Sequence, residues 1–155
     1  MVSLLRTNSE NADFIVLVRH LDADLVLRDG EDHAFFAQFN KIEQIKYAVV
    51  AYEDDLPAAC GAIKEFSSDT MEVKRMFTLP EYRGKGIASQ VLAELEGWAC
   101  ELGVCKCVLE TGIKQPEGIA LYKKNDYLVI PNYGQYADIE GSICFQKNVK
   151  ILRDK

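Results

Sequence analysis

The sequence predicts an α+β fold in which helices cover a mixed β-sheet. Two observations indicate this class. Short apolar segments follow one another through tight turns, as in an antiparallel meander, and a long amphipathic helix separates two later apolar segments, as in a βαβ unit with parallel strands. A chain of 155 residues can build one core that buries roughly 68–70% of the surface of the unfolded chain, so we expect a single domain over residues 1–155.

The first part of the chain is predicted to contain one strand and two helices. Residues 14–18 form a continuous apolar run of strand length. Residues 21–27 shift to the spacing of a helix, which Asp29 and Gly30 would end. Residues 32–40 contain three phenylalanines and predict a second, short helix.

A meander of three strands follows. Residues 47–52 and 58–66 have the composition of strands and are joined by a turn at residues 53–57. A second turn at residues 67–69 leads into a third strand at residues 70–78. Connections this short predict antiparallel pairing of successive strands.

The second half of the chain is predicted to add two helices and three strands. The first helix is defined by apolar residues at spacings of three and four, namely Ala88, Val91, Leu92, Leu95, Trp98, Ala99 and Leu102. Gly103 ends this helix, and a strand at residues 104–110 follows. A helix at residues 117–124, which Pro116 can open because a first-turn proline loses no helical hydrogen bond, precedes two last strands at residues 127–130 and 142–145.

Composition and charge exclude several classes of function. No apolar run approaches the roughly 18 residues of a membrane span, and the N-terminal residues lack the order of a signal peptide, so we expect a cytoplasmic protein. The net charge of −6 argues against nucleic acid as a partner and leaves cationic substrates open. The cysteines are odd in number and have no metal-site spacing, which predicts free, mostly buried thiols and no metal: Cys60, Cys100, Cys105, Cys107 and Cys144.

The stretch EYRGKGIASQ, residues 81–90, opens the long helix and sets Gly84 and Gly86 beside two cations. Glycine has no Cβ, so backbone N–H groups there can approach a ligand, and a helix N-terminus offers unpaired donors with partial positive charge. The stretch therefore indicates an anion site, such as one for phosphate. It matches neither the Walker pattern nor the full dinucleotide fingerprint, because position 89 is Ser, and a simple glycine turn before a helix remains an alternative.

Two segments of the chain resemble the GCN5-related N-acetyltransferases. Arg83-x-x-Gly86-x-Ala88 matches the [QR]-x-x-G-x-[GA] motif of that family, within residues 73–92, which resemble its acetyl-CoA-binding segment. Residues 120–127 resemble its helix with the LYxxxGF pattern, although Asn125-Asp126-Tyr127 stands where Leu-Gly-Phe is common. The resemblance implies a three-layer α/β/α fold on a splayed, mostly antiparallel sheet of about six to seven strands.

The resemblance also implies how acetyl-CoA, the co-substrate of the family, would bind. Its pyrophosphate would lie on the backbone amides from Arg83 to Ala88, and the N–H of Met76 would donate to the thioester oxygen and stabilise the oxyanion. The residues expected to contact the co-substrate are Met76, Phe77, Thr78, Arg83, Gly84, Lys85, Gly86, Ile87, Ala88, Ser89 and Tyr122.

Catalytic roles are implied for Tyr122, Glu72 and the Met76 amide. By the resemblance, Tyr122 stands at the position of the family's general acid, and a phenol with an unperturbed pKa near 10 is protonated at neutral pH and can give its proton to the leaving thiolate. The alternative is a Tyr that only packs the helix against the sheet. Glu72 is the first candidate for the base, and strand alternation predicts that Glu72, Lys74, Met76 and Thr78 share one face. Glu110 or ordered water are the alternatives for the base.

The expected activity is transfer of acetyl from the thioester to a primary amine of a small molecule or peptide, directly within a ternary complex. A non-catalytic acetyl-CoA-binding module and a nucleotide-binding protein are the competing hypotheses. The loop at residues 132–136 is expected on the substrate side. Lys74 and Arg75 need no functional role, because charged residues on a partly exposed strand would explain them. Acidic residues such as Glu31, Asp32, Asp54 and Asp55 suit a cation but also suit solvated loops. A homodimer is possible in this family, and the acceptor amine stays open.

Overall fold

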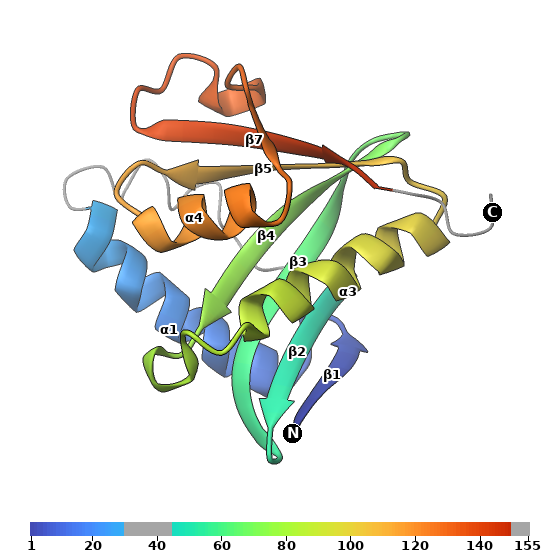
Figure 1. Ribbon diagram of the computed structural model, residues 1–155, viewed down its shortest axis with the longest axis vertical. Helices are drawn as coiled ribbons and strands as arrows, with labels where there is room; N and C mark the ends of the chain where they lie inside the picture. The colour runs from blue at the N-terminus through green and yellow to red at the C-terminus, as the bar shows by residue number, and fades with distance from the viewer. Residues whose placement is uncertain (30–44, 150–155) are drawn as a thin grey trace.

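The computed structural model describes residues 1–29 and 45–149. The helix predicted at residues 32–40 lies outside the described residues, as do the acidic residues Glu31 and Asp32. Seven strands form one sheet in the order β1-β2-β3-β4-β5-β7-β6. The β4–β5 pair is parallel and the other five described pairs are antiparallel, so the predicted mixed, mostly antiparallel sheet is confirmed (Figure 1).

Most predicted elements are present with small shifts at their ends. The strands are β1 (Val2–Thr7), β2 (Tyr47–Glu53), β3 (Leu56–Ser67), β4 (Thr70–Thr78), β5 (Lys106–Gly112), β6 (Leu128–Ile130) and β7 (Ser142–Asn148). The helices are α1 (Ala12–Asp29), α3 (Ile87–Glu101) and α4 (Pro116–Lys124), with short 3₁₀ turns η2 (Pro80–Tyr82) and η3 (Gly134–Tyr136). Both α3 and β4 follow the predicted patterns closely.

The strand predicted at residues 14–18 is wrong, because these residues belong to α1. Phe14, Leu17 and Leu21 are buried at helical spacing, whereas Val16 is half exposed. A short apolar run fits either a buried strand or one face of a helix, and the longer pattern decides. The Asn11 side chain also accepts a hydrogen bond from the Phe14 N–H at 2.9 Å, which caps the start of the helix.

The sequence patterns missed β1, which lies at one edge of the sheet and pairs with β2 from Val2↔Glu53 to Thr7↔Ala48. Val2 and Leu4 pack on the core, so the local pattern that could have predicted this strand is the alternation of these apolar residues with exposed ones. The signal is weak because the strand is short and the next residue of that face is Arg6.

Helices cover both faces of the sheet, which gives three layers (Figure 1). On one face α3 buries Val91, Leu92 and Leu95 against β-strand residues, and α4 packs there as well. On the other face α1 buries Phe14, Leu17, Val18, Leu21 and Leu25 against residues from β2, β3 and β4. The two apolar clusters hold the sheet from both sides and fix the strand ends between them.

A β-bulge interrupts β4 at Arg75 and Met76. The pairs Ala62↔Lys74 and Cys60↔Phe77 leave Gly61 alone opposite both residues, and Arg75 has φ of +60°. Arg75 therefore binds Asp22 of α1, whereas Met76 packs with the cluster on the α3 face. The prediction that Met76 shares a face with Glu72 and Lys74 is wrong, because the extra residue reverses the alternation after Lys74.

Strands β4 and β5 separate after only three paired residues. Their parallel register runs from Thr70↔Lys106 to Glu72↔Val108, and the two strands then diverge (Figure 1). Strand β5 pairs instead with β7 over its whole length, from Lys106↔Asn148 to Gly112↔Ser142. The splayed sheet implied by the family resemblance is confirmed.

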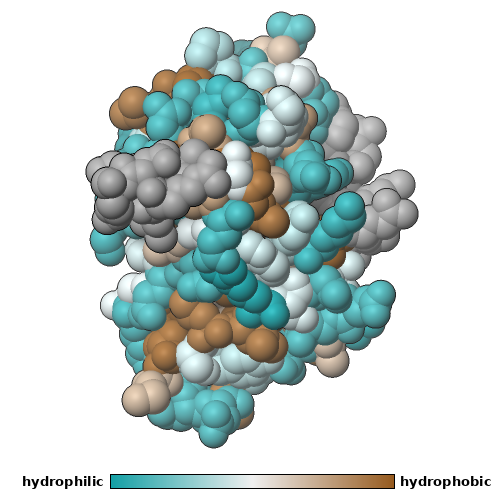
Figure 2. Space-filling view, turned by 90° about the vertical axis from the view of Figure 1, so that its right-hand side faces the viewer, coloured by the Kyte–Doolittle hydropathy of each residue, from teal (hydrophilic) through white to brown (hydrophobic). Residues whose placement is uncertain are grey.

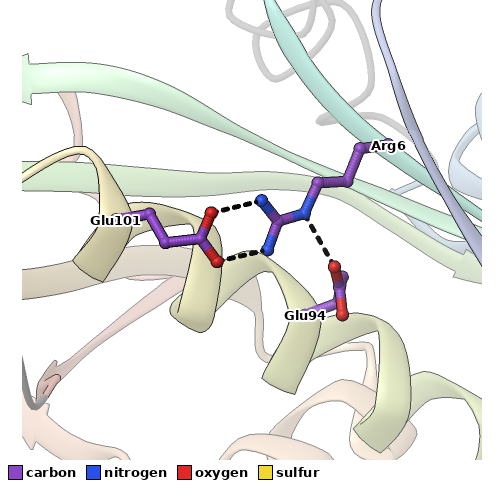
Figure 3. Close-up of polar contacts among 3 residues, drawn as sticks. All are labelled: Arg6, Glu94 and Glu101. Carbon is purple, nitrogen blue, oxygen red and sulfur yellow. Dashed lines mark hydrogen bonds and ion pairs between the residues drawn. The ribbon is translucent and has the colours of Figure 1, made fainter. Parts of the chain in front are cut away.

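Arg6 of β1 binds two carboxylates of α3, as Figure 3 shows. Its Nε donates to Glu94 at 2.7 Å, and its two terminal nitrogens donate to Glu101 at 2.7 and 2.9 Å. The guanidinium also lies 4.9 Å from the centre of the Trp98 ring. This paired geometry connects the edge strand to the helix and lowers the pKa of Glu101 through its hydrogen bonds with Arg6.

The described surface in Figure 2 is mostly hydrophilic, and the described cysteines form no disulfide bonds. Hydrophilic residues cover most of the face seen in Figure 2, where hydrophobic residues gather in separate groups. All five cysteines are free; Cys60, Cys107 and Cys144 are buried, whereas Cys105 is exposed. Within residues 1–29 and 45–149, no helix has the length and apolar character that crossing a membrane would require.

We expect Gly61→Ala to lower the free energy of unfolding by about 1–3 kcal/mol, because an added methyl overfills the core. A Cβ at this position would lie 2.4 Å from the Met76 sulfur and 3.0 Å from both Leu95 and Val91. Urea unfolding measures the effect. Gly97→Ala is the control, because a Cβ there meets nothing within 4 Å and alanine favours the helix by up to about 1 kcal/mol.

We expect Glu101→Gln to reduce stability at neutral pH and to have little effect in acid. Arg6 lowers the pKa of Glu101 in the folded protein, so its stabilisation is complete above the unfolded pKa of about 4.3 and is lost as the pH falls through the folded pKa. Urea unfolding of both proteins between neutral and acidic pH measures the difference. Exposed Glu10→Gln is the control, and a stability difference that grows in acid would contradict this account.

Candidate active site

Two adjoining cavities lie beside β4, and the larger of the two occupies about 410 Å³, within the range typical of ligand pockets. It lies beside the divergent end of β4 and is bounded by the glycine loop, the start of α3, and residues of α1, β5 and α4. Of the residues predicted to contact the co-substrate, those that line it are Met76, Phe77, Thr78, Arg83, Gly84, Gly86, Ile87, Ala88, Ser89 and Tyr122.

The glycine loop turns the chain from β4 into α3 with two left-handed residues. Gly84 and Gly86 both have φ of +80°, a conformation that other residues adopt only with strain. A Cβ at either position would meet nothing within 4 Å, so the backbone there faces open space. The helical bonding of α3 begins from Gln90 N–H to Gly86 carbonyl at 3.2 Å, and the preceding amides of the first turn have no intrahelical acceptor. The loop therefore provides the donors that an anion needs.

The two cations of the glycine stretch have different positions. Arg83 lines the cavity, and its Nε donates to the Thr78 carbonyl at 2.9 Å, which fastens the loop to the end of β4. Lys85 is not among the residues that line the cavity, because its ammonium pairs with Glu53 of β2 at 3.1 Å. The Lys85 ammonium also lies 5.5 Å from the centre of the Tyr82 ring, so its side chain is held by Glu53 and Tyr82 rather than directed into the cavity.

Contacts between α3 and α4 fix the far side of the loop. The Asn125 side chain donates to the Ser89 hydroxyl at 3.1 Å and to the Leu121 carbonyl at 2.9 Å. Asn125 is also the C-terminal cap of α4. Asn125, which stands where this family commonly has Leu, therefore supplies a side-chain amide that joins the end of α4 to the start of α3.

Tyr122 of α4 both packs in the core and lines the cavity. The centre of its ring lies 5.8 Å from the ring centres of Tyr127 and of Phe145. Tyr122 therefore does pack the helix against the sheet, as the alternative predicted, and it also faces the cavity. The residue also lines a second cavity of about 80 Å³. Burial, with a further contribution from Glu110, raises the pKa of Tyr122 above its ordinary value, which keeps the phenol protonated.

Met76 and Tyr122 lie where the two cavities adjoin, because both residues line both spaces. The smaller cavity is lined by charged residues of both signs, namely Glu72, Lys74, Arg75 and Glu110. Tyr136 also lines it. An elongated ligand in the larger space and a small polar ligand in the smaller one would therefore meet at Met76 and Tyr122.

Each of the two candidate bases accepts a hydrogen bond from a hydroxyl. Glu72 is 8% exposed and accepts from the Tyr133 hydroxyl at 2.7 Å. Glu110 accepts from the Ser142 hydroxyl at 2.6 Å. Burial and the neighbouring Glu72 raise the pKa of Tyr133, which therefore remains a donor. Tyr133 belongs to the loop at residues 132–136, which was predicted on the substrate side. Its hydrogen bond to Glu72 joins residues 61 apart in the sequence and brings this loop to the smaller cavity.

Arg75 is buried and only a small part of the Lys74 side chain is exposed, so the explanation of partly exposed strand charges is wrong. Their side chains are 10% and 3% exposed, and the Lys74 ammonium lies 4.0 Å from the Glu72 carboxylate. Burial lowers the pKa of Lys74 from its ordinary value. The fold covers these cations because α1, which the sequence placed only in part, packs over this side of β4.

Sequence reasoning missed several residues that line the cavities. Thr111 and Gln115 line both spaces, and Arg28 of α1 lines the larger one. Arg28 pairs with Asp24 at 2.9 Å and with Glu117 of α4, so it connects two helices across the larger cavity. No local pattern identifies these residues as part of a site, because the segments that enclose the two cavities lie far apart in the sequence. Among residues 1–29 and 45–149, no group of His, Cys, Asp and Glu side chains is arranged to hold a metal ion.

Comparison with known proteins agrees with this geometry. Residues 15–127 match the acetyltransferase (GNAT) family. The chain is 34% identical over 100 residues to an IAA acetyltransferase of Azospirillum brasilense, and the matched segment spans 64% of this chain and 65% of that protein.

Solved structures show the same fold over nearly the whole chain. A provisionally assigned acyl-CoA N-acyltransferase from Klebsiella pneumoniae has a TM-score of 0.81 at 26% identity, covering 97% of this chain and 99% of its own. The PaiA N-acetyltransferase of Thermoplasma acidophilum, solved in complex with coenzyme A, has a TM-score of 0.71 at 17% identity over 96% and 99% of the two chains. The resemblance to this family is confirmed, and the chain belongs to the GNAT acetyltransferase family.

Proposed function

We propose that the protein is an acetyl-CoA-dependent N-acetyltransferase that moves acetyl directly to a primary amine of a small molecule or peptide within a ternary complex. One observation carries the proposal: a cavity with a glycine loop at its edge adjoins a carboxylate-lined cavity, and Met76 and Tyr122 line both. Residues 1–155 are proposed to act as one domain, which the coverage of the Klebsiella structure supports.

The larger cavity suits coenzyme A at its phosphate end. The left-handed Gly84 and Gly86 present no Cβ toward ligand, and the first amides of α3 point their donors outward from the helix start. The helix dipole adds favourable electrostatic energy for a pyrophosphate at this position. Arg83 adds a cation at the cavity wall.

The divergent edge of β4 suits the pantetheine arm and the acetyl group. The ladder with β5 ends at Glu72↔Val108, so an extended ligand can pair with β4 as a further strand would. The Met76 amide is the proposed donor to the thioester oxygen, where it would stabilise the negative charge that develops during attack. Acetyl-CoA supplies the activated acetyl group, and the chain supplies position, proton transfer and this donor.

Two proton transfers complete the proposed reaction. The amine nitrogen forms the new C–N bond as the C–S bond breaks; Glu72 takes the amine proton directly or through water, and Tyr122 gives its proton to the leaving sulfur. Glu110 is the alternative base, because it lines the same cavity. Neither carboxylate forms a covalent bond to the acetyl group in this scheme.

We expect Tyr122→Phe to lower kcat on the order of 10²-fold or more while leaving coenzyme A binding unchanged, because only the transferable proton is lost. Release of free CoA thiol from acetyl-CoA with a set of amines measures turnover, and a thermal shift with coenzyme A measures binding. Full turnover by the variant would leave Tyr122 with its packing role alone. Binding without turnover by the wild type on every amine favours the non-catalytic module, and stabilisation by ATP or NAD but not by coenzyme A favours nucleotide binding.

The choice between the two carboxylates is decided by paired substitutions. If Glu72 is the base, we expect Glu72→Gln to lower kcat on the order of 10²-fold, with the loss reduced at high pH where free amine is more abundant, and Glu110→Gln to have a smaller effect. The pH dependence of CoA thiol release at saturating acceptor measures this. The reverse order of the two variants would assign the base to Glu110, and equal small effects would assign proton removal to water.

A further inference from the structure

The smaller cavity contains a buried cation whose hydrogen bonds are incomplete. Arg75 lines this cavity with a side chain that is 3% exposed, and one of its terminal nitrogens donates to Asp22 at 3.0 Å. Its Nε finds no acceptor within residues 1–29 and 45–149. A guanidinium has five N–H donors in a fixed plane, and buried donors in native proteins are normally paired, so this one needs a partner that the described chain does not supply.

The backbone at Arg75 is held in an unfavourable conformation. Its φ of +60° is the left-handed region, which costs free energy for any residue with a Cβ and tends to persist at binding sites. The bulge that produces this conformation also sends the Arg75 side chain toward α1, into the cavity that Lys74 also lines. Two adjacent residues therefore place two cations in one small cavity.

The same cavity also contains carboxylates. Glu72 lies 4.0 Å from the Lys74 ammonium and is held by the Tyr133 hydroxyl, and Glu110 lines the cavity as well. A ligand with one ammonium and one carboxylate would find groups of opposite sign for both ends. A ligand with two ammonium groups would instead bring its second cation against Lys74 and Arg75, at the cost of like-charge repulsion in a poorly solvated space.

We propose that Arg75 and Lys74 bind a carboxylate of the acceptor, so that the substrate is a small amine that also carries a carboxylate, such as an amino acid. The inference rests on the proposed acetyl transfer and adds the substrate class. A carboxylate at the Arg75 Nε would satisfy the buried donor through a charge-assisted hydrogen bond. The ammonium of the same acceptor lies toward Glu72 and Glu110, and the volume of about 80 Å³ limits the size of the acceptor part held there.

The test compares acceptors that differ only in the carboxylate. Common L-amino acids are assayed by CoA thiol release beside their decarboxylated amines, with serine and ethanolamine, phenylalanine and phenethylamine, and lysine and cadaverine as matched pairs. We expect the better amino acids to exceed their amines by about tenfold or more in kcat/KM, the size of one well-formed charged contact. Amines that equal or exceed their amino acids would overturn this inference and leave the acetyl transfer intact. No transfer to any acceptor, with coenzyme A still bound, would overturn both.

Two variants separate recognition from folding. Arg75→Gln removes the guanidinium and is expected to raise KM for amino acids about tenfold while KM for the matched amines stays unchanged. Arg75→Gly also removes it but suits the left-handed backbone, so it keeps the test valid if the first variant folds poorly. Asp22→Asn is the matched control, since it removes the ion-pair partner and keeps the guanidinium, and it should retain the preference for amino acids. Equal loss of amino acid and amine activity in both Arg75 variants, at unchanged melting temperature, would overturn the assignment.

Discussion

The early separation of β4 from β5 is the constraint on which the rest of the structure depends. Two central strands that stop pairing after Glu72↔Val108 leave backbone groups on their facing edges and open a space between them. The separation is stable because each strand keeps another partner, β3 for β4 and β7 for β5, and because α3 and α1 hold the two faces of the sheet. The glycine loop follows the end of β4 and α4 follows β5, so both reach the opening without further structure.

The bulge in β4 sets which side chains surround that opening. One extra residue opposite Gly61 sends Met76 to the α3 face, where the missing Cβ leaves room for its sulfur. The same residue turns Arg75 toward α1 beside Lys74, so four charged groups share a small cavity next to Met76. Strain at Arg75 and the absence of a Cβ at Gly61 are thus two parts of one local arrangement, and the packing of both helices maintains it.

Side-chain contacts between distant segments then hold the charged groups in place. Tyr133 donates to Glu72 and Ser142 donates to Glu110, so each carboxylate has a fixed orientation from a hydroxyl that follows α4 in the chain. Arg28 connects α1 to α4 across the larger cavity. Preorganised groups of this kind lower the cost of binding and orienting reactants, because little rearrangement is needed when the ligand arrives. The candidate site is therefore a product of all three layers.

The sequence by itself determined the elements whose cause is local. Strand β4 and helix α3 follow from apolar periodicity, and the glycine loop follows from the left-handed backbone that Gly84 and Gly86 allow, so the position of the proposed anion site could be predicted. The tertiary structure alone decided that residues 14–18 are helical, that Lys85 pairs with Glu53, and that Tyr133 reaches Glu72. These outcomes depend on burial and on partners far away in the chain, which periodicity and spacing do not encode. The bulge belongs to the second group, because its place is set by the pairing of β4 with Gly61.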